Sequence, residues 1–143
     1  MRFFIDTNYP DFNLNLKMIG VAKKAFQKFE TATKSNKDYK IIIENLRSIP
    51  VVLKINKNFK RIAGRMMGVM ENKALVGLTI EINPLLVEYG NKTTYDVVSH
   101  EVAHCIDYVI RGESKHDNQW KYIHKLMGGT GEKYIDGFSP DVY

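Results

Sequence analysis

Cysteine is almost absent from this 143-residue sequence, in which Cys105 stands alone. One cysteine cannot form an internal disulfide, so we expect a reducing compartment, the cytoplasm, and not secretion. Long apolar runs are missing too: AFQKF and IIIENL fall far short of the about 20 residues that a membrane span needs. The N-terminus MRFFIDTNYPDF has an early acid and proline and no small-residue cleavage site, which predicts no signal peptide and no membrane partner.

The rest of the composition is that of an ordinary globular protein. Hydrophobic residues make up 44% of the chain and charged residues 26%, and 143 residues without an internal repeat predict a single domain. The net charge of +5 favours acidic partners, with nucleic acid first among them. However, the lysines are scattered and no run of five occurs, so a solvated surface explains the charge equally well.

Hydrophobic spacing divides the chain into helices and strands. Apolar residues at helical spacing predict helices over residues 14–29, from 93 or 94 to 111, and over 117–127. Strands are predicted over residues 49–55, 61–70 and 75–82, with a hairpin turn at 71–73 between the last two. We expect residues 31–40 to be a loop or the frayed end of the first helix, and residues 130–143 to be an irregular tail. The predicted fold is α+β: an N-terminal helix, a small antiparallel sheet, then two helices.

Three of the four histidines lie close together in the sequence, within residues 99–120. His100 and His104 are four residues apart on a predicted helix, so both rings project from one face. Zinc is held by imidazole nitrogens at about 2.0–2.1 Å, and this spacing provides two of them. Glu101 can lean over a remaining coordination position and take a proton from water bound there. HEVAH therefore has the HExxH pattern of zinc metallopeptidases.

A catalytic zinc takes three protein ligands and leaves one position open, and four residues are candidates for the third ligand. Asp107 is one turn past His104 but points along the helix, which suits a residue that orients a ligand. Glu113 lies in the loop after the helix, and Glu132 is far enough downstream to return on another element. His116 follows an eleven-residue gap, enough chain to finish one helix and come back. We favour His116.

With its surroundings, this pattern resembles the SprT-like (Spartan-type) metallopeptidase domain. The resemblance covers about residues 49–129 and rests on Asn83-Pro84-Leu85-Leu86, on SHEVAH, and on His116 followed four residues later by Trp120. The upstream RIAGRM is similar to the strand that precedes the asparagine-proline segment in that family. The resemblance implies a zincin-like minimal domain with one catalytic Zn²⁺. It also implies His100, His104 and His116 as the zinc ligands, and Glu101 as the catalytic acid/base.

The chain departs from this family at two places. Asp117 stands where the family usually has glycine, and it either alters the turn or adds a carboxylate near the metal. The cysteine-rich zinc ribbon that follows the domain in several members is missing from residues 1–143, which argues against autonomous DNA binding. The metzincin pattern fits less well, because it has glycine in place of Asp107 and its third histidine in place of Ile110.

Residues with supporting roles are less well defined by the sequence. Stabilisation of the oxyanion has four candidates, namely Tyr108, Tyr122, His124 and Tyr134. Asp107 either holds a ligand imidazole in its metal-binding tautomer or is a surface acid. His124 is expected to be a partly exposed helical residue outside the metal site.

The sequence therefore predicts a zinc metalloendopeptidase that acts on a protein substrate. The family resemblance implies substrates associated with DNA, such as DNA–protein crosslinks. An alternative of another class is a module that keeps zinc for structure and binds nucleic acid or protein without catalysis. Glu101 argues against this module, because a structural site has no need of a water-activating carboxylate. A third alternative is a zinc hydrolase that cuts a bond other than a peptide.

Overall fold

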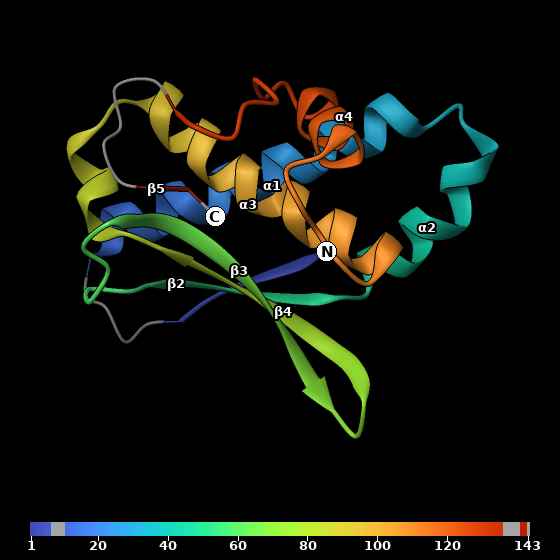
Figure 1. Ribbon diagram of the computed structural model, residues 1–143, viewed down its shortest axis with the longest axis horizontal. Helices are drawn as coiled ribbons and strands as arrows, with labels where there is room; N and C mark the ends of the chain where they lie inside the picture. Colours follow the sequence, from blue (N-terminus) through green and yellow to red (C-terminus); the bar gives the residue numbers. More distant parts are fainter. Residues whose placement is uncertain (7–10, 136–140, 143) are drawn as a thin grey trace.

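The computed structural model describes residues 1–6, 11–135 and 141–142, which form helices packed on one face of a sheet (Figure 1). In chain order the elements are β1 (Arg2–Ile5), α1 (Phe12–Thr33), α2 (Lys37–Arg47), β2 (Pro50–Ile55), β3 (Ile62–Glu71), β4 (Ala74–Ile82), the 3₁₀ helix η1 (Pro84–Glu88), α3 (Asn91–Arg111), α4 (Asn118–Leu126) and β5 (Asp141–Val142). The α+β class predicted from the sequence is therefore confirmed.

The sheet is mixed, and the prediction of a purely antiparallel sheet was wrong. Its strand order is β1-β2-β4-β3-β5. β1 pairs with β2, and β2 with β4, in parallel, whereas β3 and β4 pair antiparallel. A parallel pair needs a long crossover, which α1 and α2 provide between β1 and β2. The sequence prediction missed β1 because it is only four residues long, and with it the first parallel pair.

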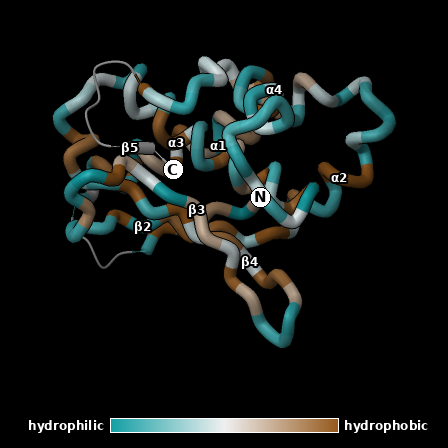
Figure 2. The backbone as a smooth tube through the Cα atoms, in the orientation of Figure 1, coloured by the Kyte–Doolittle hydropathy of each residue, from teal (hydrophilic) through white to brown (hydrophobic). Residues whose placement is uncertain are grey.

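The core lies between the sheet and the helices. Inward-facing residues alternate along β2, where Val51, Leu53 and Ile55 are buried. The buried hydrophobic residues of β4 from Leu78 to Ile82 have the same spacing, although Glu81 among them is buried as well. Hydrophobic residues gather between the layers, and the outer turns are hydrophilic (Figure 2). The helical side of the core is formed mainly by α1 and α3, which contact each other and the sheet. Its fully buried members include Met18, Ala22, Ala25, Phe29, Val98, Val102, Cys105 and Ile106.

Residues 31–40, predicted as a loop or as the frayed end of the first helix, are largely helical. Residues 31–33 complete α1, and Asn36 caps α2 by accepting a hydrogen bond from the backbone N–H of Asp38. The first turn of α2 is polar, and the residues that it buries, Ile43 and Leu46, lie in its second half. A polar start followed by a short apolar run conceals the amphipathic pattern.

The predicted hairpin is confirmed and projects from the body of the protein (Figure 1). Its turn residues Asn72 and Lys73 have φ values of 50° and 66°, as the tight two-residue turn between right-twisted strands requires. Two glycines let β3 lie close to α3. A methyl group on Gly64 would stand 3.4 Å from Cγ of Glu101, and one on Gly68 would stand 3.1 Å from Cε1 of Tyr108.

The two helices that frame the site end close to their predicted positions. α3 begins after Gly90 instead of at Thr93 or Thr94, and ends as predicted at Gly112, whose φ of 75° suits a glycine. The Asp117 carboxylate caps α4 by accepting a hydrogen bond from Trp120 N–H. The predicted irregular tail is wrong at residues 141–142, which pair with β3, and residues 136–140 and 143 lie outside the described part. Within the described ranges, no helix has the length and apolar character to cross a membrane.

Candidate metal centre

The structure brings His100, His104 and His116 together around one point. His100 and His104 project from adjacent turns of α3, and His116 stands in the short segment that precedes α4. The three Nε2 atoms are 2.9 Å (100 to 116), 3.0 Å (104 to 116) and 3.2 Å (104 to 100) apart. This is the group of potential metal ligands found among the described residues. Neither Glu113 nor Glu132 belongs to it, and both side chains are exposed.

The geometry of the three nitrogens fits a tetrahedral cation. Ligands at about 2.0–2.1 Å from zinc in tetrahedral array lie roughly 3.3–3.4 Å apart, so a small outward movement of these rings would admit the ion. Burial first, then the neighbouring imidazoles, lowers the pKa of His104 to about 3, and the same causes lower that of His100 still further. Burial also lowers the pKa of His116. The rings are therefore neutral near pH 7, the state in which imidazole binds metals.

Glu101 is fully buried on α3 and directly follows His100 in the chain. Neither carboxylate oxygen has a hydrogen-bond partner among the described residues. Burial without a partner raises the pKa of this carboxyl group well above its ordinary value. Such a group is costly to a fold, and a buried, unpartnered carboxyl group on the helix that carries two of the converging histidines is a candidate for chemistry. Nδ1 of His100 is likewise buried, and no described residue bonds to it.

Trp120 packs the two helices together behind the three clustered histidines. It is fully buried, and its Nε1–H donates to the backbone oxygen of His100 over 3.3 Å. Its ring stacks on His104 with centroids 5.1 Å apart and contacts the His116 ring at 4.8 Å. The aromatic four residues after His116 therefore fixes the position of both rings.

The prediction that His124 is partly exposed was wrong: this side chain is 1% exposed. The backbone N–H of Gly131 donates to Nδ1 over 3.0 Å, so Nε2 carries the proton and donates to Oγ of Ser99, also over 3.0 Å. Because both nitrogens are used, His124 is not a metal ligand. Its ring also stacks on Trp120. The spacing of four residues from Trp120 was the available signal, because it places both residues on the inner face of α4.

The cleft beside the histidines has a volume of about 270 Å³ and is lined by Arg65, Met66, His104, Ser114 and His116. The tyrosines considered for the oxyanion do not line it. Tyr122 and Tyr134 are 49% and 66% exposed, and Tyr134 borders a separate pocket near Asp96. Tyr108 packs against Gly68 of β3. A tyrosine as oxyanion stabiliser therefore stays a prediction without support from the cleft.

Asp107 is buried and close to the site, but it does not contact a histidine ring directly. Its carboxylate accepts hydrogen bonds from Arg111 and from the hydroxyl of Ser114. Ser114, which the sequence did not single out, in turn contacts His104 Nδ1 at 2.6 Å. Asp117, where the resemblance expects glycine, pairs with Arg111 as well as capping α4.

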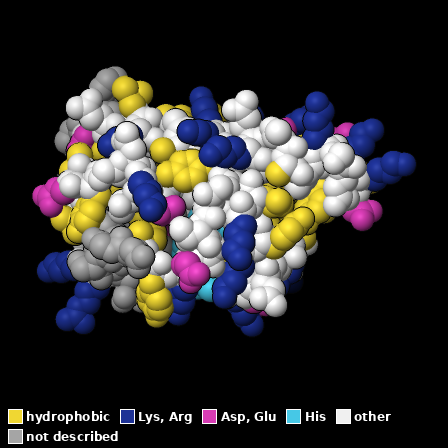
Figure 3. Space-filling model, turned by 90° about the horizontal axis from the view of Figure 1, so that it is seen from above, with side chains coloured by type: hydrophobic (Ala, Val, Ile, Leu, Met, Phe, Trp, Pro, Cys, Tyr) yellow, Lys and Arg dark blue, Asp and Glu magenta, His cyan; other side chains and the backbone are white. Residues whose placement is uncertain are grey.

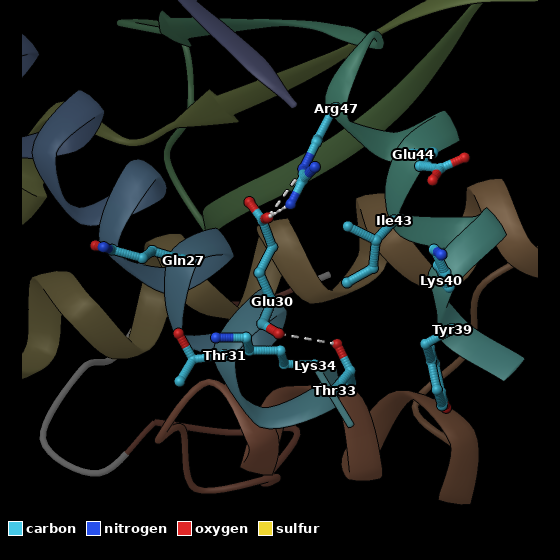
Figure 4. A pocket seen from close by; sticks show the side chains of 10 residues that line it. All are labelled: Gln27, Glu30, Thr31, Thr33, Lys34, Tyr39, Lys40, Ile43, Glu44 and Arg47. Atoms are coloured by element: carbon cyan, nitrogen blue, oxygen red, sulfur yellow. Dashed lines mark hydrogen bonds and ion pairs between the residues drawn. The ribbon is translucent and has the colours of Figure 1, made fainter. Parts of the chain in front are cut away.

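A larger cavity, of about 490 Å³, lies between α1 and α2 (Figure 4). Arg47 reaches across from α2 to form an ion pair with Glu30 of α1 at 2.8 Å. Acidic and basic side chains alternate around this cavity, and no histidine lines it. Its described lining residues include no group of potential metal ligands, so the smaller histidine-lined cleft is the candidate site.

Comparison with known families gives a match that includes the histidine cluster. The sequence profile of the SprT-like family matches residues 22–143, a span that includes HEVAH, His116 and Trp120. The comparison with curated proteins and the comparison with solved structures found no match.

Proposed function

Because the chain belongs to the SprT-like family, we propose that it is a zinc-dependent metallopeptidase that hydrolyses peptide bonds in protein substrates. The observation that carries the proposal is the convergence of three neutral imidazole nitrogens. It is supported by Glu101, which follows His100 on α3 and whose buried carboxyl group has no partner among the described residues. A module that used zinc only for structure would gain nothing from Glu101 and would bear the cost of burying it.

In this proposal the chain supplies both the metal ligands and the proton carrier. His100, His104 and His116 hold Zn²⁺ through their Nε2 atoms. When bound, zinc supplies a Lewis acid that lowers the pKa of water and polarises the carbonyl of the scissile bond. A carboxylate oxygen of Glu101 accepts the proton of the attacking water and passes it to the departing amine. The buried setting of Glu101 raises its pKa, which suits a group that holds a proton between the two steps.

The substrate is proposed to lie as an extended chain along the outer edge of β3. On this edge, β5 pairs only with Ile62 and Gly64, so within the described residues the backbone of 65–71 has no ladder partner there. Arg65 and Met66 of this open edge face the histidine cleft. Free backbone N–H and C=O groups bind extended peptides by adding a strand.

DNA-associated proteins, including DNA–protein crosslinks, are the proposed substrate class. The net charge of +5 supports this, and so does a groove of about 420 Å³ between α1 and the start of α3. Lys17, Lys24, Lys28 and Lys92 line this groove, and none of its described lining residues is acidic. The ammonium groups of Lys24 and Lys28 lie 5.9 and 5.0 Å from the centroid of the Tyr95 ring. Lysines and arginines are also spread over the helical face, where some histidine surface is visible (Figure 3). We call the groove lined by these four lysines, between α1 and the start of α3, the lysine groove.

The proposal is tested by incubating the zinc-loaded protein with a DNA-bound protein, with and without the DNA. We expect fragments of the bound protein to appear only when zinc is present, and faster when DNA is present. The Glu101→Gln variant is the matched control, because it keeps the three histidines. Binding without cleavage by the wild-type protein would favour the non-catalytic module. Cytoplasmic location stays part of the proposal; the burial of Cys105 is compatible with it.

A further inference from the structure

Ser114 lies between the carboxylate of Asp107 and the ring of His104. Its Oγ is 2.8 Å from Oδ2 of Asp107 and 2.6 Å from Nδ1 of His104. A serine hydroxyl has one proton, and an ionised carboxylate only accepts hydrogen bonds, so that proton goes to Asp107. The remaining contact therefore needs the proton on Nδ1 of His104, and this leaves Nε2 without one. Nε2 of His104 is the atom that faces the other two histidines.

Asp107 can accept the hydrogen bond of Ser114 in a fixed orientation because Arg111 holds its carboxylate. It is fully buried at the base of the site, and Arg111 donates to both of its oxygens, over 2.7 and 2.6 Å. The same guanidinium donates to both oxygens of Asp117, over 2.9 and 3.0 Å. Arg111 thus ties the end of α3 to the start of α4. Ser114 and His116 both lie in the segment that this clamp closes.

From these contacts we infer that Ser114 is a positioning residue of the metal centre, which sets the tautomer and orientation of His104. It does so through the hydrogen bonds between Asp107 and Ser114 and between Ser114 and His104, which we call the relay. The bonds of Arg111 to Asp107 and Asp117 hold the relay in a fixed position relative to His116. His100 has no equivalent, because its Nδ1 has no partner among the described residues. The relay therefore acts on one ligand of three. The inference rests on the proposed function only through its metal, not through peptide hydrolysis.

Three variants of single serines test the relay. Ser114→Ala removes the hydroxyl, and Ser114→Thr keeps it and adds a methyl group. Ser48→Ala removes an exposed hydroxyl that donates to the backbone oxygen of Asn45, far along the chain from the site. Zinc affinity is measured by competition with a chelator, and the free energy of unfolding of the zinc-free protein is measured beside it.

We expect Ser114→Ala to weaken zinc binding by about 10- to 100-fold, the usual effect of losing a group that orients a metal ligand. Ser114→Thr should stay within a few-fold of the wild type, and Ser48→Ala should match it. A purely structural role would lower the stability of zinc-free Ser114→Ala and leave its zinc affinity unchanged, which would overturn the inference. Weakened zinc binding supports the relay even if no peptide is cleaved, in which case only the proposed peptidase activity fails.

A second measurement does not depend on how the variants fold. In the zinc-free wild-type protein, the ¹⁵N shifts of the His104 ring should show a protonated Nδ1 and an unprotonated Nε2. The opposite tautomer would overturn the inference.

The cobalt-substituted protein gives a further readout: the visible spectrum of Ser114→Ala should differ from that of the wild type, and that of Ser48→Ala should not. Identical spectra for the wild type, Ser114→Ala and Ser48→Ala would contradict the relay.

Discussion

Gly129 lies directly against the ring of His124: a methyl group at residue 129 would stand 2.1 Å from Nε2. That distance is far below any van der Waals contact, so the ring and the chain after α4 are packed without room for a side chain. The hydrogen bonds of His124 to Ser99 and Gly131 make the ring a fixed part of the core.

Gly129→Ala should therefore destabilise the protein by about 1–3 kcal/mol or more, as overpacking of a core does. Gly20→Ala is the matched control. Gly20 is inside α1 with no atom within 4 Å of an added methyl group, so alanine there should stabilise by about 0.5–1 kcal/mol. Urea denaturation measures both. Equal effects of the two substitutions would contradict the packing described for His124.

Glu101→Gln should keep zinc bound and lower the rate of peptide hydrolysis by at least about 100-fold, because the amide cannot accept the proton of the attacking water. Zinc content and turnover are measured on the same preparation. Glu113→Gln, at an exposed position outside the histidine cluster, serves as the control and should leave both unchanged. Wild-type turnover in the Glu101 variant would remove the proposed role of this carboxylate.

The stability of the zinc-free protein should fall as the pH drops from about 6.5 to about 4. Burial lowers the pKa of His124 to about 4, whereas in the unfolded chain it is near 6.5. Between these values the unfolded state binds the proton and the folded state does not, so acid favours unfolding. This histidine alone contributes up to about 3 kcal/mol, fully present above about 6.5 and lost below about 4.

His124→Gln tests that contribution, because glutamine has no proton to bind in this range. The variant should be less stable than the wild type at neutral pH, since it loses the stacked ring. Its unfolding free energy should then depend less steeply on pH between about 4 and 6.5. Denaturant titrations at several pH values give both slopes, and parallel slopes would show that His124 does not stay neutral in the fold.

Replacing Lys24 and Lys28 with glutamine should weaken DNA binding through the lysine groove. If each lysine contacts one phosphate, the slope of log affinity against log salt should become shallower by about 2. Lys34→Gln with Lys40→Gln removes the same charge from the cavity between α1 and α2 and should change the slope less. Equal changes in the two double variants would show that the groove is not the DNA-binding surface.

The parts of the structure predicted from the sequence are those that depend on local spacing. His100 and His104 share a face because they are four residues apart on one helix, and the turn at Asn72 and Lys73 follows from the polar residues 71–73 between two β-type stretches. The parallel pairing of β1 with β2 was missed because it joins residues almost fifty positions apart, and no local pattern reports such a partner.

Within the site, the sequence identified the residues of a motif and missed those that act through tertiary contacts. Ser114 is an unremarkable loop serine until α3 and α4 bring it between Asp107 and His104. The burial of His124 likewise depends on the chain returning over it at Gly129 and Gly131. Residues that orient a ligand are selected by the packing around it, which short sequence patterns do not contain.

The most direct test of the proposed metal centre is X-ray absorption at the zinc edge of the protein loaded with one equivalent of zinc. We expect three imidazole nitrogens at about 2.0–2.1 Å and one oxygen, with one nitrogen fewer in His116→Ala. Sulfur in the coordination shell, four protein nitrogens, or a spectrum unchanged by His116→Ala would contradict a catalytic centre formed by these three histidines.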